Sequence, residues 1–204
     1  MSYGSVVLLG SFIGVLNLLF MCLIQKKEGL AIFTKTIWYK QKMVWFLLVG
    51  MCIVSSYLFW LSSGFTEEYI VKLCLISYLV PLCLYDIRYQ LLPDILHIIY
   101  FFLFFCIKFF IGSWYHLIDG AVGLLVLFFI CSFIYLLKKD QFGFGDMKVL
   151  CVCAFLTGIP DIFYFVFRAT LIAAVVGVVK LLLHKAQLKT ELPFIPFLLI
   201  GTLV

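Results

Sequence analysis

The protein has 204 residues, of which 66% are hydrophobic and 12% are charged. A soluble domain is about half apolar and about a quarter charged, so this composition excludes an ordinary soluble fold. The formal net charge of +5 could indicate nucleic-acid binding. The basic residues lie between long apolar segments, however, and this distribution indicates membrane topology. We therefore expect no nucleic-acid partner.

Long apolar segments without strand-like alternation recur along the whole chain, and a membrane-crossing helix needs about 20 such residues. The candidate spans are residues 4–24, 43–62, 69–87, 95–113, 117–137, 145–158, 162–183 and 191–204, of which the sixth and eighth are short. The first has no basic leader, so we interpret it as a retained helix and not as a cleaved signal. Since a bilayer admits only helices or closed barrels, these segments predict an all-α, polytopic bundle of about eight helices in contact with membrane lipid.

The basic residues predict the orientation of the chain. If the N-terminus is outside, most of the 15 lysines and arginines lie on the inner side, and only Lys72, Lys108 and Arg168 lie in the outer half. The longest polar stretch, residues 25–42, is too short for a domain and suits an amphipathic segment at the inner surface. We therefore expect residues 1–204 to form a single domain of a multi-pass protein of the cell membrane, with 25–42 as a short cytoplasmic loop.

The eight cysteines lie almost all inside apolar segments, and none forms a C-x-x-C pair. We interpret them as small buried side chains and not as a disulfide framework or a zinc site. Cys151 and Cys153 are close in sequence, but side chains two residues apart on a helix point in different directions. We therefore expect neither a metal nor another cofactor.

Acidic residues in or beside a membrane are costly and suggest function by default. Several of the acids in this chain have a simpler interpretation. Glu67 and Glu68 fall in an expected outer loop, and Asp161 suits the N-cap of a helix after Pro160. Asp119 opens the fifth span and suits a cap or an interface role.

Asp86 and Asp146 are the acids that a solvated loop explains less well. Asp86 ends the third span and Asp146 starts the sixth, so two spans separate them and both lie at the same, inner face. Two neighbouring carboxylates cannot both ionise easily and hold one proton between them. One can take a proton from water while the other protonates a carbonyl oxygen, as in peptide hydrolysis. Pro93 suits the first turn of the fourth helix, and Asp94 belongs to the same turn.

The sequence "GFGD" at 143–146 places two glycines before the second of these acids. Gly143 and Gly145 permit backbone angles that are closed to other residues, and they leave room for a substrate strand. The alternative is a plain turn in which Asp146 is the N-cap of the next helix. Lys148 either orients this loop or marks the inner face.

These motifs resemble those of the type IV prepilin peptidases, a family of membrane aspartic proteases. "GFGDMKVL" is similar to the family's G-x-G-D-x-K-L-L, and Asp86 followed by "IRYQLLPD" is similar to its D-x6-P-[DN] motif. "GSFIGVLN" at 10–17 resembles its N-terminal motif. "LPFIPFLLIG" at 192–201 resembles its closing motif, with Ile195 in place of the usual glycine. The resemblance covers nearly the whole chain.

The resemblance implies an endopeptidase that removes the leader of prepilins or pseudopilins at the cytoplasmic face, typically after a glycine, for pilus, secretion or competence assembly. Asp86 and Asp146 would be its catalytic pair. Gly143 and Gly145 would shape the loop at the substrate, with Lys148 beside them.

One feature departs from many bacterial members of the family. Those members carry an insert after the first span with two C-x-x-C pairs that bind zinc, and they methylate the new N-terminus with S-adenosylmethionine. Residues 25–42 contain no cysteine, so zinc has no thiolate ligands there. We therefore expect a peptidase without methyl transfer, similar to a shortened bacterial form, such as one from a Gram-positive cell.

Three alternatives remain open at this point. The first is a presenilin-like or signal-peptide-peptidase-like protease, whose motifs are loosely similar to the sequence at Tyr85–Asp86, 143–146 and Leu192–Pro193. A small transporter would also use intramembrane acids, but it predicts acids near mid-span and inverted repeats. A non-catalytic assembly subunit could retain the same motifs.

Overall fold

The computed structural model describes residues 10–15, 17, 50, 52–54, 57, 66–90, 92–110, 114–137, 143–159, 161–183 and 193–203. It divides into two compact units, residues 1–81 and 82–204. The predicted loop 25–42 lies outside the described residues, as does most of the predicted spans 4–24 and 43–62. The described ranges contain helices and no strand, which confirms the all-α class.

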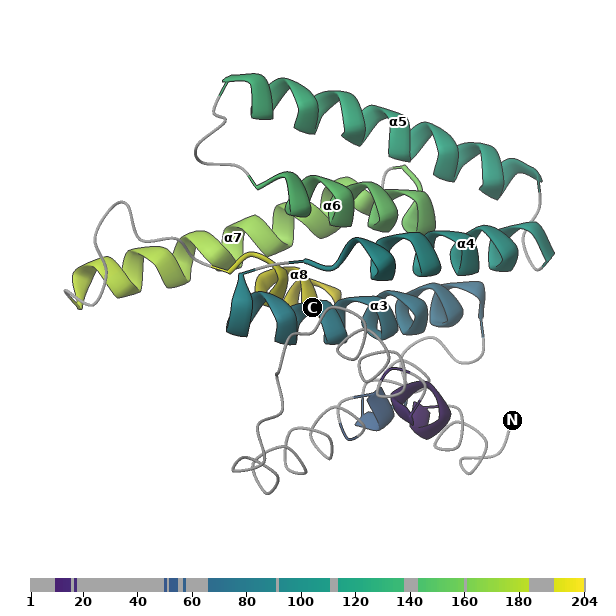
Figure 1. Ribbon diagram of the computed structural model, residues 1–204, viewed down its shortest axis with the longest axis horizontal. Helices are drawn as coiled ribbons and strands as arrows, with labels where there is room; N and C mark the ends of the chain where they lie inside the picture. The colour runs from purple at the N-terminus through teal and green to yellow at the C-terminus, as the bar shows by residue number, and fades with distance from the viewer. Residues whose placement is uncertain are drawn as a thin grey trace. The chain divides into compact units, whose positions relative to one another are not determined.

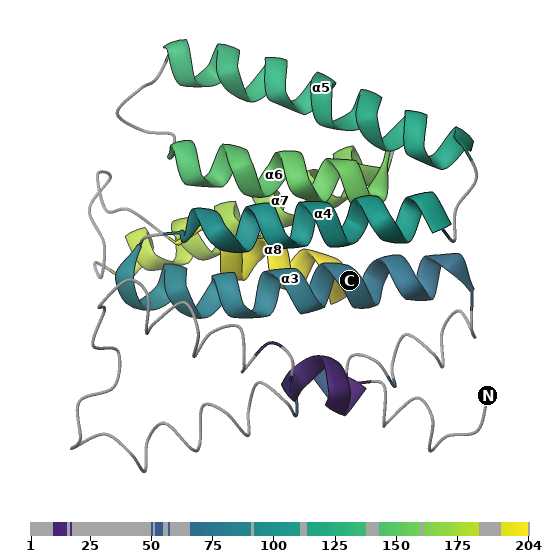
Figure 2. The same ribbon diagram turned by 45° about the vertical axis from the view of Figure 1, so that its right-hand side comes forward.

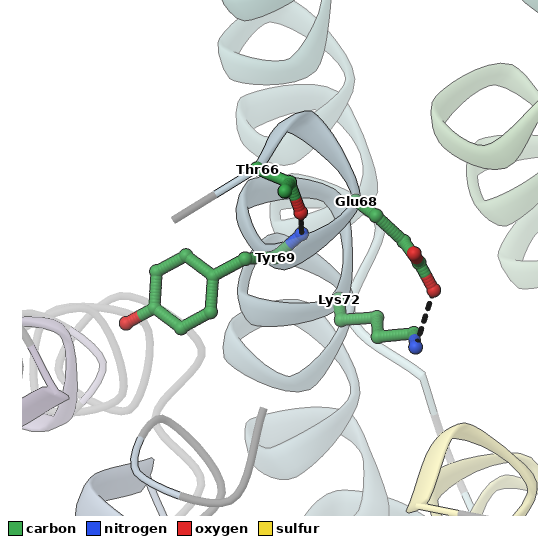
Figure 3. Close-up of polar contacts among 4 residues, drawn as sticks. All are labelled: Thr66, Glu68, Tyr69 and Lys72. Atoms are coloured by element: carbon green, nitrogen blue, oxygen red, sulfur yellow. Dashed lines mark hydrogen bonds and ion pairs between the residues drawn. The ribbon is translucent and has the colours of Figure 1, made fainter. Parts of the chain in front are cut away.

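In the first unit the longest described element is the beginning of α3 (Glu67–Tyr89). The Thr66 hydroxyl caps the helix by accepting a hydrogen bond from the Tyr69 N–H at 3.4 Å (Figure 3). Glu68 and Lys72, one turn apart, form an ion pair at 2.5 Å. The prediction that Glu68 lies in a loop is therefore wrong, because the cap and the ion pair extend the helix to Glu67.

The second unit contains the end of α3 and the helices α4 (Asp94–Phe110), α5 (Trp114–Leu137), α6 (Phe144–Thr157), α7 (Asp161–Leu182) and α8 (Ile195–Leu203). α6 packs against both α4 and α5, and α8 packs along α7. Both views show α6 between α5 and α4 (Figures 1 and 2). Most side chains of α6 are buried, so α6 is a central helix of this unit.

Among the residues that the structure describes, three helices are long and apolar enough to cross a membrane, judged by length and composition: Glu68–Ile87, Trp114–Leu137 and Asp161–Leu182. Large apolar side chains on α5 and α7, such as Phe129 and Phe167, are exposed, as expected for surfaces that face lipid. The helices α4, α6 and α8 coincide with predicted segments but have 17, 14 and 9 residues. They are therefore shorter than the roughly 20 residues of a typical span, and eight crossings remain a prediction.

The turn between α6 and α7 is held by a polar contact with α5. Asp119 accepts a hydrogen bond from the Ile159 N–H at 3.3 Å, which confirms its predicted interface role. Gly158 has a φ of +79°, and a Cβ there would overlap the Asp119 carboxylate. Lys108, predicted in the outer half of the membrane, is buried and donates to the His116 carbonyl at 2.9 Å.

Asp161 lies at the first residue of α7, where its charge complements the helix dipole. The cysteines that the structure describes are free, and Cys153 is fully buried as predicted. Cys106 is exposed and Cys151 partly exposed, so burial is not a property of every cysteine.

Candidate active site

Asp86 lies in the last turn of α3 with only 7% of its surface exposed. Its Oδ2 accepts a hydrogen bond from the backbone N–H of Ile195 at 3.0 Å. The N–H of Phe194 is a second favourable interaction with the same carboxylate. Since Ile195 is the first residue of α8, Asp86 satisfies backbone donors that the start of that helix leaves without an intrahelical partner.

The chain leaves the helix α3 in a sharp turn at Gln90. The Gln90 N–H donates to the Asp86 carbonyl at 3.0 Å, and Gln90 has a φ of 51°. A residue in this left-handed conformation ends α3 one turn after Asp86. The chain then reaches Pro93, whose carbonyl accepts from the Leu96 N–H at 3.1 Å, and α4 begins at Asp94. Proline suits this position because its missing N–H would have no helical partner.

Asp146 lies in the first turn of α6 and is partly buried. Burial and the negative charge of Asp86 raise the pKa of Asp146 to about 6. The two carboxyl groups are therefore close enough for one charge to act on the other. The N-cap of α6 is Gly143, without a side-chain hydrogen bond, so the interpretation of Asp146 as a helix cap is wrong.

Two contacts join the turn after Asp86 to the first turn of α6. Gly145 lies against Leu92, because a Cβ on Gly145 would be 3.0 Å from Leu92 Cδ1. Lys148 Nζ contacts Asp94 Oδ1 at 2.5 Å and lies 4.8 Å from the centre of the Phe144 ring. The Lys148 ammonium holds the pKa of the Asp94 carboxyl below its usual range. Together these contacts bring the segments that carry both aspartates against each other.

The glycines of "GFGD" have a different explanation from the predicted one. Gly143 has φ −72° and ψ 132°, an extended conformation open to any residue. A Cβ on Gly143 would lie 3.1 Å from Asp146 Oδ2, so the absence of a side chain leaves space for that carboxylate. Gly145 likewise leaves space for Leu92. Both glycines are thus explained by close approach of the chain's own side chains.

The sequence motifs identified Asp86, Asp146 and Lys148, which the structure brings together within the second unit. They did not identify Asp94 as the partner of Lys148, nor any role for Ile195. The signal for Ile195 was present in "PFIP" at 193–196. Prolines lack a backbone N–H, so a buried helix that begins between two prolines has few N–H groups in its first turn. Each of those N–H groups needs a hydrogen-bond acceptor.

This arrangement can hold one proton between two carboxyl groups, so it can both accept and donate a proton. Within the described ranges, no group of three or more His, Cys, Asp or Glu residues is placed to hold a metal ion.

Comparison with known proteins identifies the family of the chain. A family model described as the type IV leader peptidase family matches residues 73–178, just over half of the chain and including both aspartates. The prepilin leader peptidase/N-methyltransferase of Pseudomonas aeruginosa is 30% identical over 158 residues, covering 75% of this chain and 54% of that protein. The protein of the same name from Bacillus subtilis is 28% identical over 145 residues, covering 69% of this chain and 56% of that protein.

The chain spans about half the length of the curated relatives that it matches. No solved structure shows a significant match to it. The family model nevertheless covers the turn after Asp86, α6 with Asp146, and the helices between them. The resemblance seen in the sequence is thereby confirmed, and the chain belongs to the type IV leader peptidase family.

Proposed function

We propose that the protein is an aspartic endopeptidase that removes the leader of prepilins or pseudopilins at the cytoplasmic face of the cell membrane. The observation that carries the proposal is the contact between the turn after Asp86 and the first turn of α6, where Asp146 lies; the carboxyl groups of Asp86 and Asp146 are both partly or fully buried. The substrate class rests on the names of the relatives, which are prepilin leader peptidases.

In the proposed reaction, one carboxylate takes a proton from a water molecule as the water oxygen attacks the carbonyl carbon of the scissile bond. The other carboxyl gives its proton to the carbonyl oxygen, which produces a neutral tetrahedral intermediate. When the C–N bond breaks, a proton passes to the leaving amine and the carbonyl re-forms. The pair ends with the one proton that it had at the start, and no covalent enzyme intermediate forms.

The proposed membrane arrangement keeps eight crossings, with the N-terminus outside and both aspartates at the inner face. It is supported by the basic residues of the predicted inner loops and by two helices, α4 and α5, between the two aspartates. An even number of crossings returns the chain to the same face. The leader of a prepilin would then be cut where it emerges on the cytoplasmic side.

We limit the proposed activity to peptide hydrolysis. The matched relatives are named for two activities, leader peptidase and N-methyltransferase. Residues 25–42 contain no cysteine, so they offer no thiolate ligands for the zinc that the resemblance would place in a longer insert.

The proposal is tested by co-expressing the protein with a pilin-like substrate in which a glycine precedes the scissile bond. Leader removal is followed on a gel, and the product is identified by mass spectrometry. Asp86→Asn and Asp146→Asn should each abolish cleavage while the protein still inserts. Asp161→Asn, at an exposed carboxyl on α7, is the matched control and should cleave normally.

Normal cleavage by either active-site variant would contradict the assignment. A cut inside the apolar segment of the substrate would favour the presenilin-like alternative, which the family match does not support. A methylated product N-terminus would contradict the restriction to peptide hydrolysis. A protein that leaves the substrate whole would favour the transporter or assembly-subunit interpretation.

A further inference from the structure

The start of α8 presents very few backbone donors. Pro196 has no N–H, and the N–H groups of Phe197 and Leu198 both donate to the Phe194 carbonyl, at 3.1 and 3.3 Å. The N–H groups of Ile195 and Phe194 are thus left to bind an acceptor from elsewhere. That acceptor is the Asp86 carboxylate, 3.0 Å from the Ile195 nitrogen and 109 residues away in sequence.

This contact distinguishes the two carboxyl groups. Burial disfavours the ionised form of Asp86, whereas the positive end of the α8 dipole and the charge-assisted hydrogen bond from Ile195 favour that form. Among the described residues, nothing donates a hydrogen bond to Asp146, which instead experiences burial and the negative charge of Asp86. Two described titratable groups lie beside Asp86: Asp146 on α6 and Cys83, three residues earlier on α3.

We propose that the backbone N–H of Ile195 is a positioning group for catalysis: it holds the Asp86 carboxylate ionised and oriented as the base, which leaves Asp146 as the acid. The inference rests on the proposed function and adds a division of roles within the pair. Asp86 accepts the proton of the attacking water, and Asp146 gives its proton to the carbonyl oxygen. In this inference the proline-flanked segment 193–196 belongs to the active site, because it supplies the N–H that binds Asp86.

Hydrogen exchange tests the contact without any need for cleavage. Between Pro193 and Phe197 the chain has backbone N–H groups only at Phe194, Ile195 and Phe197, so a peptide from this segment reports few amides. In the full-length protein in lipid nanodiscs, Asp86→Ala should accelerate exchange in this peptide about tenfold or more, as expected on loss of a hydrogen bond to a charged group. Asp146→Ala should leave the rate unchanged. Equal exchange rates in both variants would overturn the inference.

The catalytic role is tested by replacing the Ile195 amide with an ester, through the hydroxy-acid analogue of isoleucine. The ester removes the N–H and keeps the side chain, which is fully buried. It should lower kcat on the order of 10- to 100-fold with KM nearly unchanged, because one hydrogen bond to the charged base is lost. The acid limb of the pH–rate profile should move to higher pH, since the ionised base has lost a donor.

An ester at Ile200, on an exposed position of the same helix, is the matched control. It should leave kcat within about threefold and the acid limb in place, because it perturbs only a hydrogen bond of the helix itself. If the ester at Ile195 leaves kcat unchanged, or if the esters at Ile195 and Ile200 lower kcat equally, the inference is overturned and the proposed function still stands. Absence of cleavage by the unsubstituted protein would instead overturn the proposed function on which it rests.

Discussion

Breaking the ion pair between Asp94 and Lys148 should reduce cleavage much more than it reduces stability. The pair is partly exposed, with 66% of the Asp94 side chain and 31% of the Lys148 side chain accessible. Such a pair contributes about 0.2–1 kcal/mol to folding. It also joins the segments that carry Asp86 and Asp146, and a shift of about 1 Å in reacting groups can cost on the order of 100-fold in rate. Asp94→Asn or Lys148→Met should therefore lower kcat/KM by about 10- to 100-fold.

The pair between Glu68 and Lys72 is a close control. It has the same 2.5 Å separation, and its side chains are 63% and 33% exposed. Glu68→Gln and Lys72→Met should therefore change the unfolding free energy by a similar amount, about 0.2–1 kcal/mol. They should leave kcat/KM within about twofold, because this pair joins two residues of one helix turn.

A charge exchange separates the ion pair from the identity of its residues. Asp94→Lys combined with Lys148→Asp restores the attraction but removes the ammonium from the Phe144 ring, 4.8 Å away. That cation–π contact is worth about 0.5–1 kcal/mol, so the double variant should recover to within about two- to fivefold of the natural rate. Cleavage kinetics in nanodiscs and thermal unfolding of the same samples provide the two measurements. Equal activity losses in both ion pairs, or no recovery in the exchange variant, would refute the reasoning.

Three further predictions concern stability and pH. Gly158→Ala should lower the thermal unfolding midpoint by several degrees, because Gly158 has a φ of +79° and a Cβ would overlap the Asp119 carboxylate. An unchanged midpoint in scanning fluorimetry would contradict this prediction. Gln90→Gly should raise the unfolding free energy by about 0.5–1 kcal/mol, because a φ of 51° strains a residue with a side chain; a loss of stability in a denaturant titration would count against it. kcat/KM should fall as pH rises through about 6, because the acid Asp146 has a pKa raised to that value and must stay protonated; a flat profile up to alkaline pH would exclude this role.

The helices of the second unit could be predicted from the sequence because each apolar segment is bounded by a local signal. The predicted segment 145–158 and α6 differ by one residue at each end, since Gly143 and Gly158 flank the apolar run. α3 begins earlier than predicted, because the Thr66 cap and the contact between Glu68 and Lys72 extend it. Local chemistry therefore accounts for both the agreement and the error.

The contacts of the candidate site were harder to predict. The span count placed Asp86 and Asp146 at one face, but it carried no information on which groups would surround each carboxyl. The hydrogen bond from Ile195 to Asp86 joins residues 109 apart in sequence, and it depends on where α8 packs. The glycines were recognised for backbone freedom, whereas Gly143 has an ordinary conformation and Gly145 is required by the approach of Leu92.

The most direct test of the central claim is the cleavage rate of purified protein with Asp86→Asn, Asp146→Asn and the two substitutions combined. Two carboxyls that share one proton act as a unit, so removal of either should remove nearly all of the catalysis that the pair provides. We predict that each single variant loses on the order of 1,000-fold or more in kcat and that the double variant is no slower than the slower single one. A single variant that retains kcat within about tenfold, or losses that simply multiply in the double variant, would contradict the account.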